Sequence, residues 1–366
     1  MQKSKIINWG IMGSGKRAYD FAKSLATIKH GRLVAVASRN HDRAMDFANT
    51  FQISQYYSSY SQLANNSEID IVYIATPNSC HKENALICLN ANKGVLVEKP
   101  FTTNADDAKI LIDLSQKKKL FLMEAMWTRF IPAFDRIDRL IQSDTIGEVR
   151  FFTATLGLPS RVDLKSNLFN SVMGGGSVLD LGVYPIFLSE YFFGSPMAIK
   201  SSAYYGDTDV DLMTTVILNY SRGRQASITS SITNRLSNNG YIYGTKGMIE
   251  IHQPLYCPTA LTVVSYGKEG HIKGGSILMK KALDYARSSS LLKNLYANHP
   301  LIGQFLLRNK RKLTINLPIK GNGLQYMAED VSNYLINRPS KSNIIPLSST
   351  MSVMQTIEKI RAEWHV

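Results

Sequence analysis

Acidic, basic and phenolic side chains occur beside turn-forming residues in two stretches of the sequence. Glu98, Lys99 and Pro100 follow an apolar run, and Asp180 and Tyr184 are four residues apart after a triple glycine. Residues four apart lie on one face of a helix, so Asp180 and Tyr184 can act together. A carboxylate, an ammonium and a phenol are groups that can move a proton on and off a substrate hydroxyl. Taken alone, however, E-K-P is more typical of an ordinary surface lysine.

The stretch GIMGSGKRA, which begins at Gly10, allows two interpretations as a phosphate-binding loop. It nearly matches the G-x-x-x-x-G-K-[ST] loop of triphosphate-binding proteins, but Arg17 occupies the position of the Ser or Thr whose hydroxyl binds Mg²⁺. Gly13, Gly15 and Ala18 instead match the dinucleotide pattern G-x-G-x-x-A, between an apolar run and a helical pattern. The glycines would permit a tight turn and close approach to a pyrophosphate at the helix N-terminus. The context therefore favours a dinucleotide.

The end of the second apolar run indicates which dinucleotide. It reads Ser38, Arg39 and Asn40, with Arg43 one turn later. NAD-specific sites usually have Asp or Glu here to bind the ribose hydroxyls. A hydroxyl and a guanidinium suit the 2′-phosphate of NADP, which a carboxylate would repel. Alternatively, Arg39 is only a solvated loop residue. The pattern favours NADP, with NAD as the second choice.

Apolar runs and amphipathic segments alternate over the first 124 residues. We expect strands separated by helices, with the strands at 6–11, 33–38, 69–75, 95–98 and 120–124. Continuous apolar strands alternating with helices indicate a parallel sheet covered on both faces, an α/β doubly wound Rossmann domain. Lys99 and the Thr76-Pro77-Asn78 turn follow strands, so both are expected at the carboxyl edge, where ligands of such folds bind.

From about residue 148 the pattern changes to runs rich in β-branched and aromatic residues, several alternating with polar ones. This is typical of half-buried antiparallel strands. Helical patterns recur at 177–193, 326–337 and 349–364. We therefore predict a Rossmann domain over 1–124 and an α+β domain over 125–366, built on a large, mostly antiparallel open sheet.

Six motifs together resemble the Gfo/Idh/MocA family of glucose–fructose oxidoreductase, inositol dehydrogenase and rhizopine-catabolism proteins. They are GIMGSG at 10–15, ATPN at 75–78, EKP at 98–100, MEAMWTRFIP at 123–132, GGGSVLDLGVYP at 174–185 and GTKGMIEI at 244–251. The resemblance covers nearly the whole chain. MEAMWTRF and Tyr184, four residues after Asp180, are most similar to the dihydrodiol dehydrogenase and D-xylose dehydrogenase branch. Better-known members of the family have histidine at the position of Tyr184.

The resemblance implies that Lys99 is the catalytic lysine, joined to Pro100 by a cis bond, and that Asp180 and Tyr184 complete the reacting set. A tyrosine phenol is a poor base at neutral pH, because its reference pKa is about 10. A nearby ammonium favours the phenolate and stabilises charge on the substrate oxygen. Our hypothesis makes Tyr184 the general acid/base, Lys99 its electrostatic and proton-relay partner, and Asp180 the orienting group. The division of roles between Lys99 and Tyr184 stays open.

The remaining candidates stand at turns and strand ends. We expect the cofactor site to be formed by Gly10, Met12, Gly13, Ser14, Gly15, Ser38, Arg39, Arg43, Thr76, Pro77, Asn78, His81, Glu98 and Lys99. Trp127 and Arg129 are candidates for the substrate site beside the catalytic residues, although Trp127 is equally suited to the interdomain core. The seven histidines are scattered, so we predict no metal site.

The formal net charge of +14 is concentrated in one segment. Residues 268–312 hold ten Lys or Arg against two acidic residues, a net +8. We interpret this segment as an insertion packed on the second domain; the alternative is a docking surface for an anionic membrane, polymer or partner chain. The rest of the chain is too mildly basic to suggest a nucleic-acid groove.

Three cysteines without paired spacing and no apolar run that could span a bilayer predict a cytoplasmic protein.

The leading function is an NAD(P)-dependent oxidoreductase that transfers hydride between the nicotinamide and a hydroxyl-bearing carbon of a sugar, polyol or cyclic diol. The open sheet face and the resemblance suggest a homodimer or homotetramer. The alternative is a catalytically silent dinucleotide-binding sensor or scaffold that docks through residues 268–312.

Overall fold

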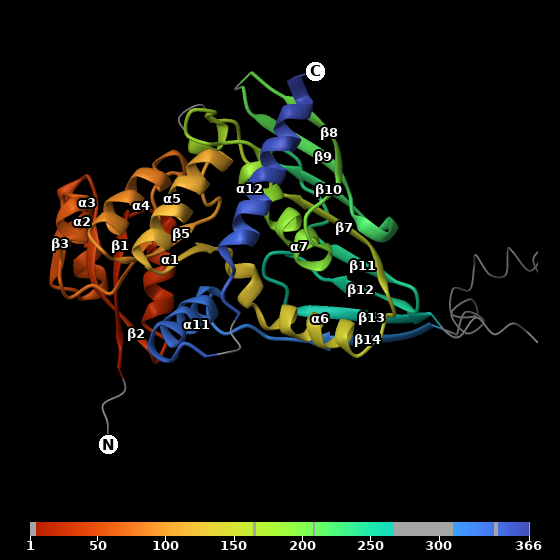
Figure 1. Cartoon of the computed structure of the whole chain (residues 1–366), viewed down its shortest axis with the longest axis horizontal. Coiled ribbons are helices and arrows are strands. Elements are labelled where there is room, and N and C mark those ends of the chain that lie inside the picture. The colour runs from red at the N-terminus through yellow and green to blue at the C-terminus, as the bar shows by residue number, and fades with distance from the viewer. Residues whose placement is uncertain (1–4, 164–165, 208, 267–309, 340–342, 366) are drawn as a thin grey trace, which may run out of the picture.

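The computed structural model describes residues 5–163, 166–207, 209–266, 310–339 and 343–365. Two sheets lie side by side, each covered by helices (Figure 1). The first has six strands in the order β3-β2-β1-β4-β5-β6, all of them parallel. This is the doubly wound order of dinucleotide-binding domains, and it confirms the predicted fold class.

The first sheet and its helices follow the predicted alternation. Its strands are β1 (Ile7–Met12), β2 (Gly31–Ala37), β3 (Gln55–Tyr57), β4 (Ile71–Ile74), β5 (Gly94–Glu98) and β6 (Leu122–Ala125). The helices between them are α1 (Lys16–Leu25), α2 (His41–Phe51), α3 (Tyr60–Ala64), α4 (His81–Asn90) and α5 (Ala105–Lys118). The central strand β4 is buried along its whole length because helices cover both faces.

Two short elements of this domain lacked a signal in the sequence. The edge strand β3 has three residues, none of them buried, and α3 has five residues. A three-residue edge strand buries too little apolar surface to leave a periodic pattern, so the sequence did not indicate it.

The second sheet has eight strands in the order β14-β13-β12-β11-β7-β10-β9-β8. They are β7 (Val149–Gly157), β8 (Ala198–Tyr205), β9 (Asp211–Asn219), β10 (Gln225–Ser231), β11 (Gly240–Gly244), β12 (Gly247–Ile251), β13 (Ala260–Tyr266) and β14 (Lys310–Asn316). Only the pairing of β10 with β7 is parallel. The sheet is therefore mostly antiparallel, as predicted.

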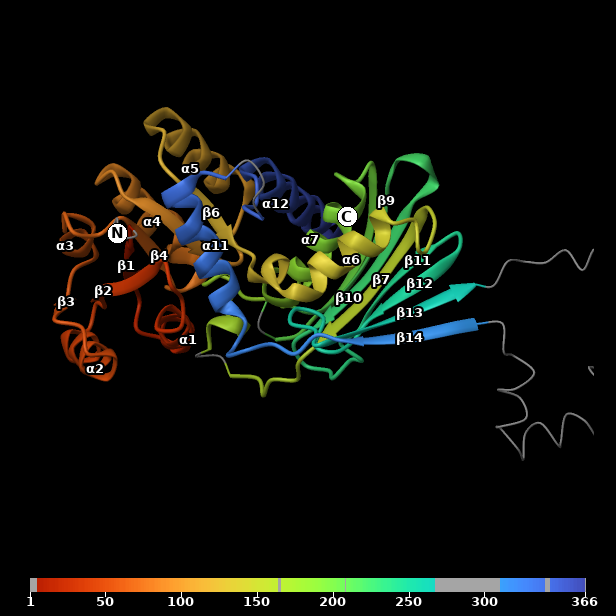
Figure 2. The same cartoon turned by 90° about the horizontal axis from the view of Figure 1, so that it is seen from below.

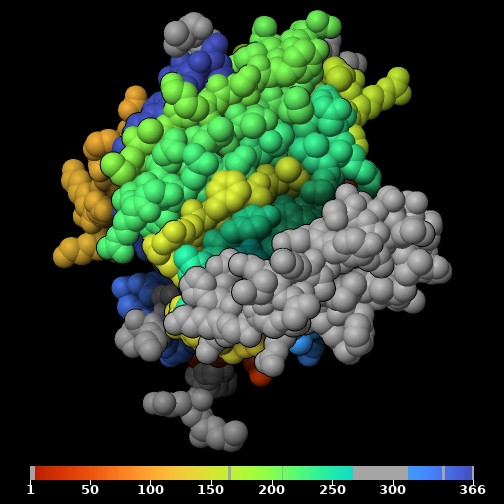
Figure 3. Space-filling view, turned by 90° about the vertical axis from the view of Figure 1, so that its right-hand side faces the viewer, coloured from red at the N-terminus to blue at the C-terminus, as the bar shows by residue number. Residues whose placement is uncertain are grey.

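One face of this sheet packs against α7 (Val183–Phe193), while α6 (Pro132–Gln142) lies on the same side (Figure 2). Figure 3 looks onto the other face, where strands β7 to β10, in yellow and green, lie at the surface with no described helix over them. Burial alternates along these strands, so that Phe152 is buried and its neighbour Phe151 faces outward.

The last two helices connect the second domain back to the first. Helix α11 (Leu324–Asn337) packs on α1, and α12 (Leu347–Ala362) contacts both α5 and α7 (Figure 1). The indole Nε1 of Trp9 in β1 donates to Ser332 Oγ in α11 at 3.0 Å. The division at residues 124 and 125 stays a prediction; α11 and α12, assigned to the second domain, also pack on the first.

Most of the basic segment 268–312 lies outside the described residues. Its last three residues, Lys310 to Lys312, belong to β14, which pairs antiparallel with β13. The segment thus connects two neighbouring strands of the second sheet. Within the described part of the chain, no helix combines the length and apolar character needed to cross a bilayer.

The Trp9–Ser332 hydrogen bond generates a stability prediction. Ser332→Ala leaves the buried indole N–H without its partner, and it should lower the free energy of unfolding by about 1–2 kcal/mol. Urea denaturation measures the effect, with the exposed Ser61→Ala on α3 as control, for which less than about 0.5 kcal/mol is expected. Equal losses in both variants would contradict the assigned role of this contact.

Candidate active site

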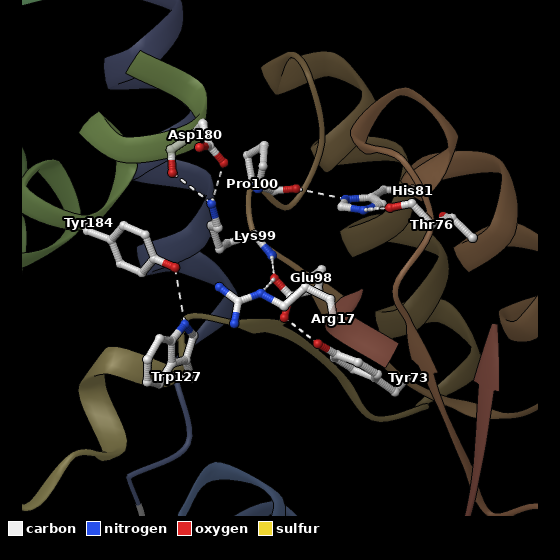
Figure 4. Close-up of polar contacts among 10 residues, drawn as sticks. All are labelled: Arg17, Tyr73, Thr76, His81, Glu98, Lys99, Pro100, Trp127, Asp180 and Tyr184. Carbon is white, nitrogen blue, oxygen red and sulfur yellow. Dashed lines mark hydrogen bonds and ion pairs between the residues drawn. The ribbon is translucent and has the colours of Figure 1, made fainter. Parts of the chain in front are cut away.

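Lys99 is held at the carboxyl edge of the first sheet, directly after β5. Its bond to Pro100 is cis, as the family resemblance implied. Its side chain is only 8% exposed, and Nζ donates to the main-chain oxygen of Asp180 at 2.7 Å and to Asp180 Oδ1 at 2.8 Å (Figure 4). Burial alone would lower the pKa of Lys99, but Asp180 and the Tyr184 phenol raise it above its ordinary value. Lys99 therefore stays an ammonium.

Tyr184 completes the cluster from the first turn of α7. Lys99 Nζ lies 5.0 Å from the centre of its ring, a distance at which an ammonium is attracted to the aromatic face. The Tyr184 hydroxyl accepts a hydrogen bond of 3.1 Å from Trp127 Nε1 (Figure 4). The structure thus brings Lys99, Asp180 and Tyr184 together from different segments.

The helix that carries Asp180 and Tyr184 differs from the regular helix expected over 177–193. Residues Val178–Gly182 form a π-helical turn before α7 begins at Val183. In an α-helix Pro185 would lack an N–H for Leu181 and its ring would press on that carbonyl, so a wider turn relieves the conflict. Asp180 points its carboxylate at Lys99 from this turn (Figure 4).

The glycine loop has the geometry of a dinucleotide turn. Gly13 has φ of +107°, and a Cβ there would lie 2.5 Å from the carbonyl oxygen of Ala75. Gly15 meets nothing within 4 Å, so the space that a side chain would fill is open to a phosphate. Gly15 also precedes α1 without a side-chain cap, which leaves the first N–H groups of that helix for an anion. These features fit a bound pyrophosphate.

A cleft of about 550 Å³ extends from this loop to Lys99 and Asp180. At its far end Ser14 Oγ donates to Ser38 Oγ at 3.0 Å, and Arg39 and Arg43 line the wall. The only carboxylates among the described lining residues are Glu98 and Asp180, both at the Lys99 end. The ribose end of the cleft therefore has two guanidinium groups and no acidic side chain.

The ATPN turn and His81 connect the loops around Lys99. The His81 ring is buried, and its nitrogens lie 2.8 Å from the Pro100 oxygen and 3.0 Å from the Thr76 oxygen (Figure 4). Burial lowers the pKa of His81. Asn78 Nδ2 donates to the Gly174 oxygen at 2.9 Å, which ties this turn to the second domain. Pro77 lines the same cleft.

Five predicted site residues lie away from the cleft wall, among them Tyr184, which is only 3% exposed and packs on Lys99. Gly10 packs against Ile69, and Met12 is buried. Trp127 is only 3% exposed and lies behind Tyr184. Arg129 forms ion pairs with Asp135 and Asp138, each at 3.2 Å. It lines a separate cavity of about 460 Å³ beside α7 and α12.

Three functional neighbours had no assigned role at the sequence level. The Tyr73 hydroxyl donates to Glu98 Oε1, and Arg17 Nε lies 4.0 Å from Glu98 Oε2 (Figure 4). Glu124, fully buried in β6, accepts from Phe101 N at 3.1 Å and from Thr350 Oγ1 at 3.2 Å. The signal available for Glu124 was a carboxylate inside an otherwise apolar strand.

Two family descriptions match the chain. The oxidoreductase family with an NAD-binding Rossmann fold matches residues 7–126, and the GFO/IDH/MocA C-terminal domain matches residues 134–250. The chain belongs to the Gfo/Idh/MocA oxidoreductase family. The resemblance inferred from the six motifs is thereby confirmed.

Several curated relatives of this family member are trans-1,2-dihydrobenzene-1,2-diol dehydrogenases. The enzyme of Sus scrofa is 38% identical over 272 residues, which cover 72% of this chain and 79% of the relative. The enzyme of Homo sapiens is 36% identical over the same coverage of both chains. These relatives lie in the branch that the tyrosine at 184 indicated.

Solved structures share the fold of this Gfo/Idh/MocA protein over its whole length. An aldose-aldose oxidoreductase from Caulobacter crescentus, complexed with glycerol, has a TM-score of 0.79 at 20% identity and covers 99% of this chain and 98% of its own. A 3-ketoreductase from Actinomadura kijaniata, complexed with NADP and TDP-benzene, has a TM-score of 0.78 at 21% identity and covers 98% of both chains.

The buried Glu124 predicts a pH dependence of stability. Burial raises its pKa to about 7, despite the hydrogen bonds from Thr350 and Phe101. Between pH 4.5 and pH 7 the folded chain therefore holds a proton that the unfolded chain releases, so the free energy of unfolding falls as pH rises through this window. Glu124 should account for about 3 kcal/mol of that fall.

The measurement is urea denaturation at pH 5 and pH 8 in the wild type and Glu124→Gln, whose amide keeps an acceptor oxygen. The variant should lose about 3 kcal/mol of the difference between the two pH values. Glu83→Gln, at an exposed position on α4, serves as control and should leave the difference unchanged. An unchanged difference in Glu124→Gln would show that this carboxyl titrates normally.

Proposed function

We propose that this protein is an NADP-dependent oxidoreductase that interconverts a hydroxyl and a carbonyl on a sugar, polyol or cyclic diol. The observation that carries the proposal is that Lys99 and Asp180 line the end of the dinucleotide cleft while the Tyr184 ring packs directly behind Lys99. Membership of an oxidoreductase family supports the reaction class. A silent sensor would not require all three groups to converge on one point of the cleft.

The bound nicotinamide supplies the hydride chemistry; the chain's own residues handle the proton and the charge. When the substrate is oxidised, its carbinol C–H bond breaks as hydride leaves, the hydroxyl proton passes to the oxygen of a Tyr184 phenolate to give the neutral phenol, and a C=O group remains. Trp127 donates to that same oxygen and stabilises its negative charge. Lys99, fixed as an ammonium by Asp180, stabilises the charge on the substrate oxygen.

The cofactor preference rests on the ribose end of the cleft. Ser14, Ser38, Arg39 and Arg43 surround the position that a 2′-phosphate would occupy, and no carboxylate lines that part. The 3-ketoreductase of similar fold was crystallised with NADP, which supports the same choice. The pyrophosphate would lie against Gly15 and the first N–H groups of α1.

The substrate class rests on the relatives. The dehydrogenases of Sus scrofa and Homo sapiens act, by name, on trans-1,2-dihydrobenzene-1,2-diol, and a structural neighbour is an aldose-aldose oxidoreductase. The name of the first substrate describes two hydroxyl groups on neighbouring carbons, and an aldose carries several such pairs. We therefore place the substrate among vicinal diols and sugars.

The open face of the second sheet supports self-association into a homodimer or homotetramer. The ring centre of Phe151 lies 5.8 Å from that of Tyr243, which stacks on Tyr241 at 6.1 Å, and the register of β7 and β11 places all three on the outward side. Ile217 on β9 is 39% exposed on the same face. Apolar side chains on an open sheet face are suited to an interface between copies of the chain. The free thiols of Cys80, Cys88 and Cys257 further support a cytoplasmic location.

The proposed roles predict the effect of two substitutions. Lys99→Met and Tyr184→Phe should each lower kcat by about 10²–10⁴-fold, because each removes a group that acts on the transferred proton or its charge. Initial rates of NADPH formation or consumption on trans-1,2-dihydrobenzene-1,2-diol and D-xylose measure this. Fluorescence titration should show that both variants still bind NADPH. Near-wild-type turnover in both would refute the assignment.

The cofactor preference predicts a second, independent result. Arg39→Gln should weaken NADPH binding by about 10-fold or more, because a charge-assisted hydrogen bond to the 2′-phosphate is lost, and should leave NADH binding nearly unchanged. Fluorescence titration with both cofactors measures the two affinities. Lys118→Gln on α5, outside the cleft, is the charge-matched control. Tighter binding of NADH than NADPH by the wild type would overturn the preference.

A further inference from the structure

Arg17 lies at the reacting end of the cleft, although it belongs to the glycine loop by sequence. It occupies the first turn of α1, and its side chain extends past Glu98 toward Trp127 and Tyr184 (Figure 4). Its Cζ lies 5.6 Å from the centre of the Trp127 ring. The indole face therefore supports the guanidinium from one side.

The guanidinium of Arg17 has one ion-pair partner among the described residues, Glu98, and its N–H groups are otherwise unoccupied by them. Arginine carries five N–H donors, and Arg17 forms no side-chain hydrogen bond to any other described residue. Its contact with Glu98 is a loose ion pair at 4.0 Å, and Glu98 already accepts from Tyr73 and from the Lys99 main-chain N–H. The Arg17 side chain is 40% exposed, so its free donors are open to the cleft.

The charges at this end of the cleft form two pairs, Lys99 with Asp180 and Arg17 with Glu98, but only the first pair is in hydrogen-bond contact. Lys99 is neutralised by Asp180 at 2.8 Å. Burial alone would lower the pKa of Arg17, but the Glu98 carboxylate and the phenols of Tyr184 and Tyr73 raise it further above its usual range. A planar, permanently charged fork with free donors suits a bidentate oxyanion such as a carboxylate or a phosphate.

We propose that Arg17 is a specificity-determining residue that binds an anionic group of the substrate while Tyr184 and Lys99 act on its hydroxyl-bearing carbon. The inference rests on the proposed function and narrows its substrate class to acidic compounds, namely sugar acids or sugar phosphates. The cofactor pyrophosphate has its own donors in the N–H groups at the start of α1. The guanidinium is directed away from that position, toward the Tyr184 side of the cleft (Figure 4).

The test compares matched acidic and neutral substrates. Initial rates with D-glucuronate, D-glucose 6-phosphate and D-glucose separate a carboxylate from a phosphate and from no anion. For the wild type, kcat/KM on one acidic compound should exceed that on D-glucose by at least about 10-fold, as a charge-assisted hydrogen bond provides. Arg17→Met should lower this acid-to-neutral ratio by about 10-fold or more, chiefly through KM, and Arg17→Lys should retain part of it.

The control is Lys23→Met, which removes one positive charge from the exposed last turn of the same helix and should leave the ratio unchanged. Fluorescence titration with NADPH accompanies each variant. A wild-type preference for D-glucose, or an unchanged ratio in Arg17→Met, overturns the proposal. Weaker NADPH binding by Arg17→Met with an unchanged ratio would assign the guanidinium to the cofactor instead.

A binding measurement separates this inference from the proposed function. D-glucuronate and D-glucose 6-phosphate are titrated into the protein–NADPH complex, and the change in cofactor fluorescence is followed. If one acid binds and Arg17→Met weakens this binding by about 10-fold, the inference is supported even when no compound is turned over. The absence of turnover would then refute only the proposed reaction. Absence of Arg17-dependent acid binding refutes the inference, whatever the turnover on neutral diols.

Discussion

The burial of one ammonium group constrains the whole site. Lys99 is 8% exposed, and a charge so far out of water is costly unless another group compensates it. Its partner, Asp180, comes from a turn that packs on the second sheet, so the ion pair forms only when the two sheets are docked. The Asn78–Gly174 and Glu124–Thr350 hydrogen bonds cross the same boundary and hold the loops on both sides. The geometry of the Lys99–Asp180 pair therefore depends on how the two sheets pack against each other.

The same constraint divides the cleft into two electrostatic regions. At the ribose end, Arg39 and Arg43 face no acidic lining residue, which favours a phosphate. At the other end, Asp180 holds Lys99 as a cation, and Trp127 donates a hydrogen bond to the Tyr184 oxygen. Arg17 adds a second cation to this region, in a loose ion pair with Glu98.

Much of this arrangement could be predicted from the sequence, because it is local. The glycine turn, the buried parallel strands and the spacing of Asp180 and Tyr184 each leave a pattern within a few residues. The place of Arg17 in the site could not be predicted. In the sequence Arg17 only argues against a triphosphate loop, because it stands where that loop has a hydroxyl, and the neighbouring residues do not show where its long side chain points. Arg129 failed to reach the cleft because Asp135 and Asp138 on the following helix pair with it. The packing of α11 on α1 depends on contacts far apart in sequence, which no local pattern records. The π turn at Val178–Gly182 has a local cause in Pro185, but a helical period of 3.6 residues does not reveal it.

Hydride transfer to a nicotinamide is the central claim, and isotope transfer tests it most directly. The protein is incubated with NADP and with trans-1,2-dihydrobenzene-1,2-diol, D-xylose, D-glucuronate or D-glucose 6-phosphate, each deuterated at its hydroxyl-bearing carbons, and the recovered cofactor is analysed by mass spectrometry. We predict that NADPH formed with at least one of these compounds carries a single deuterium and that the Tyr184→Phe variant forms far less of it. NADPH without deuterium, or no NADPH from any of them although the cofactor binds, would contradict the account.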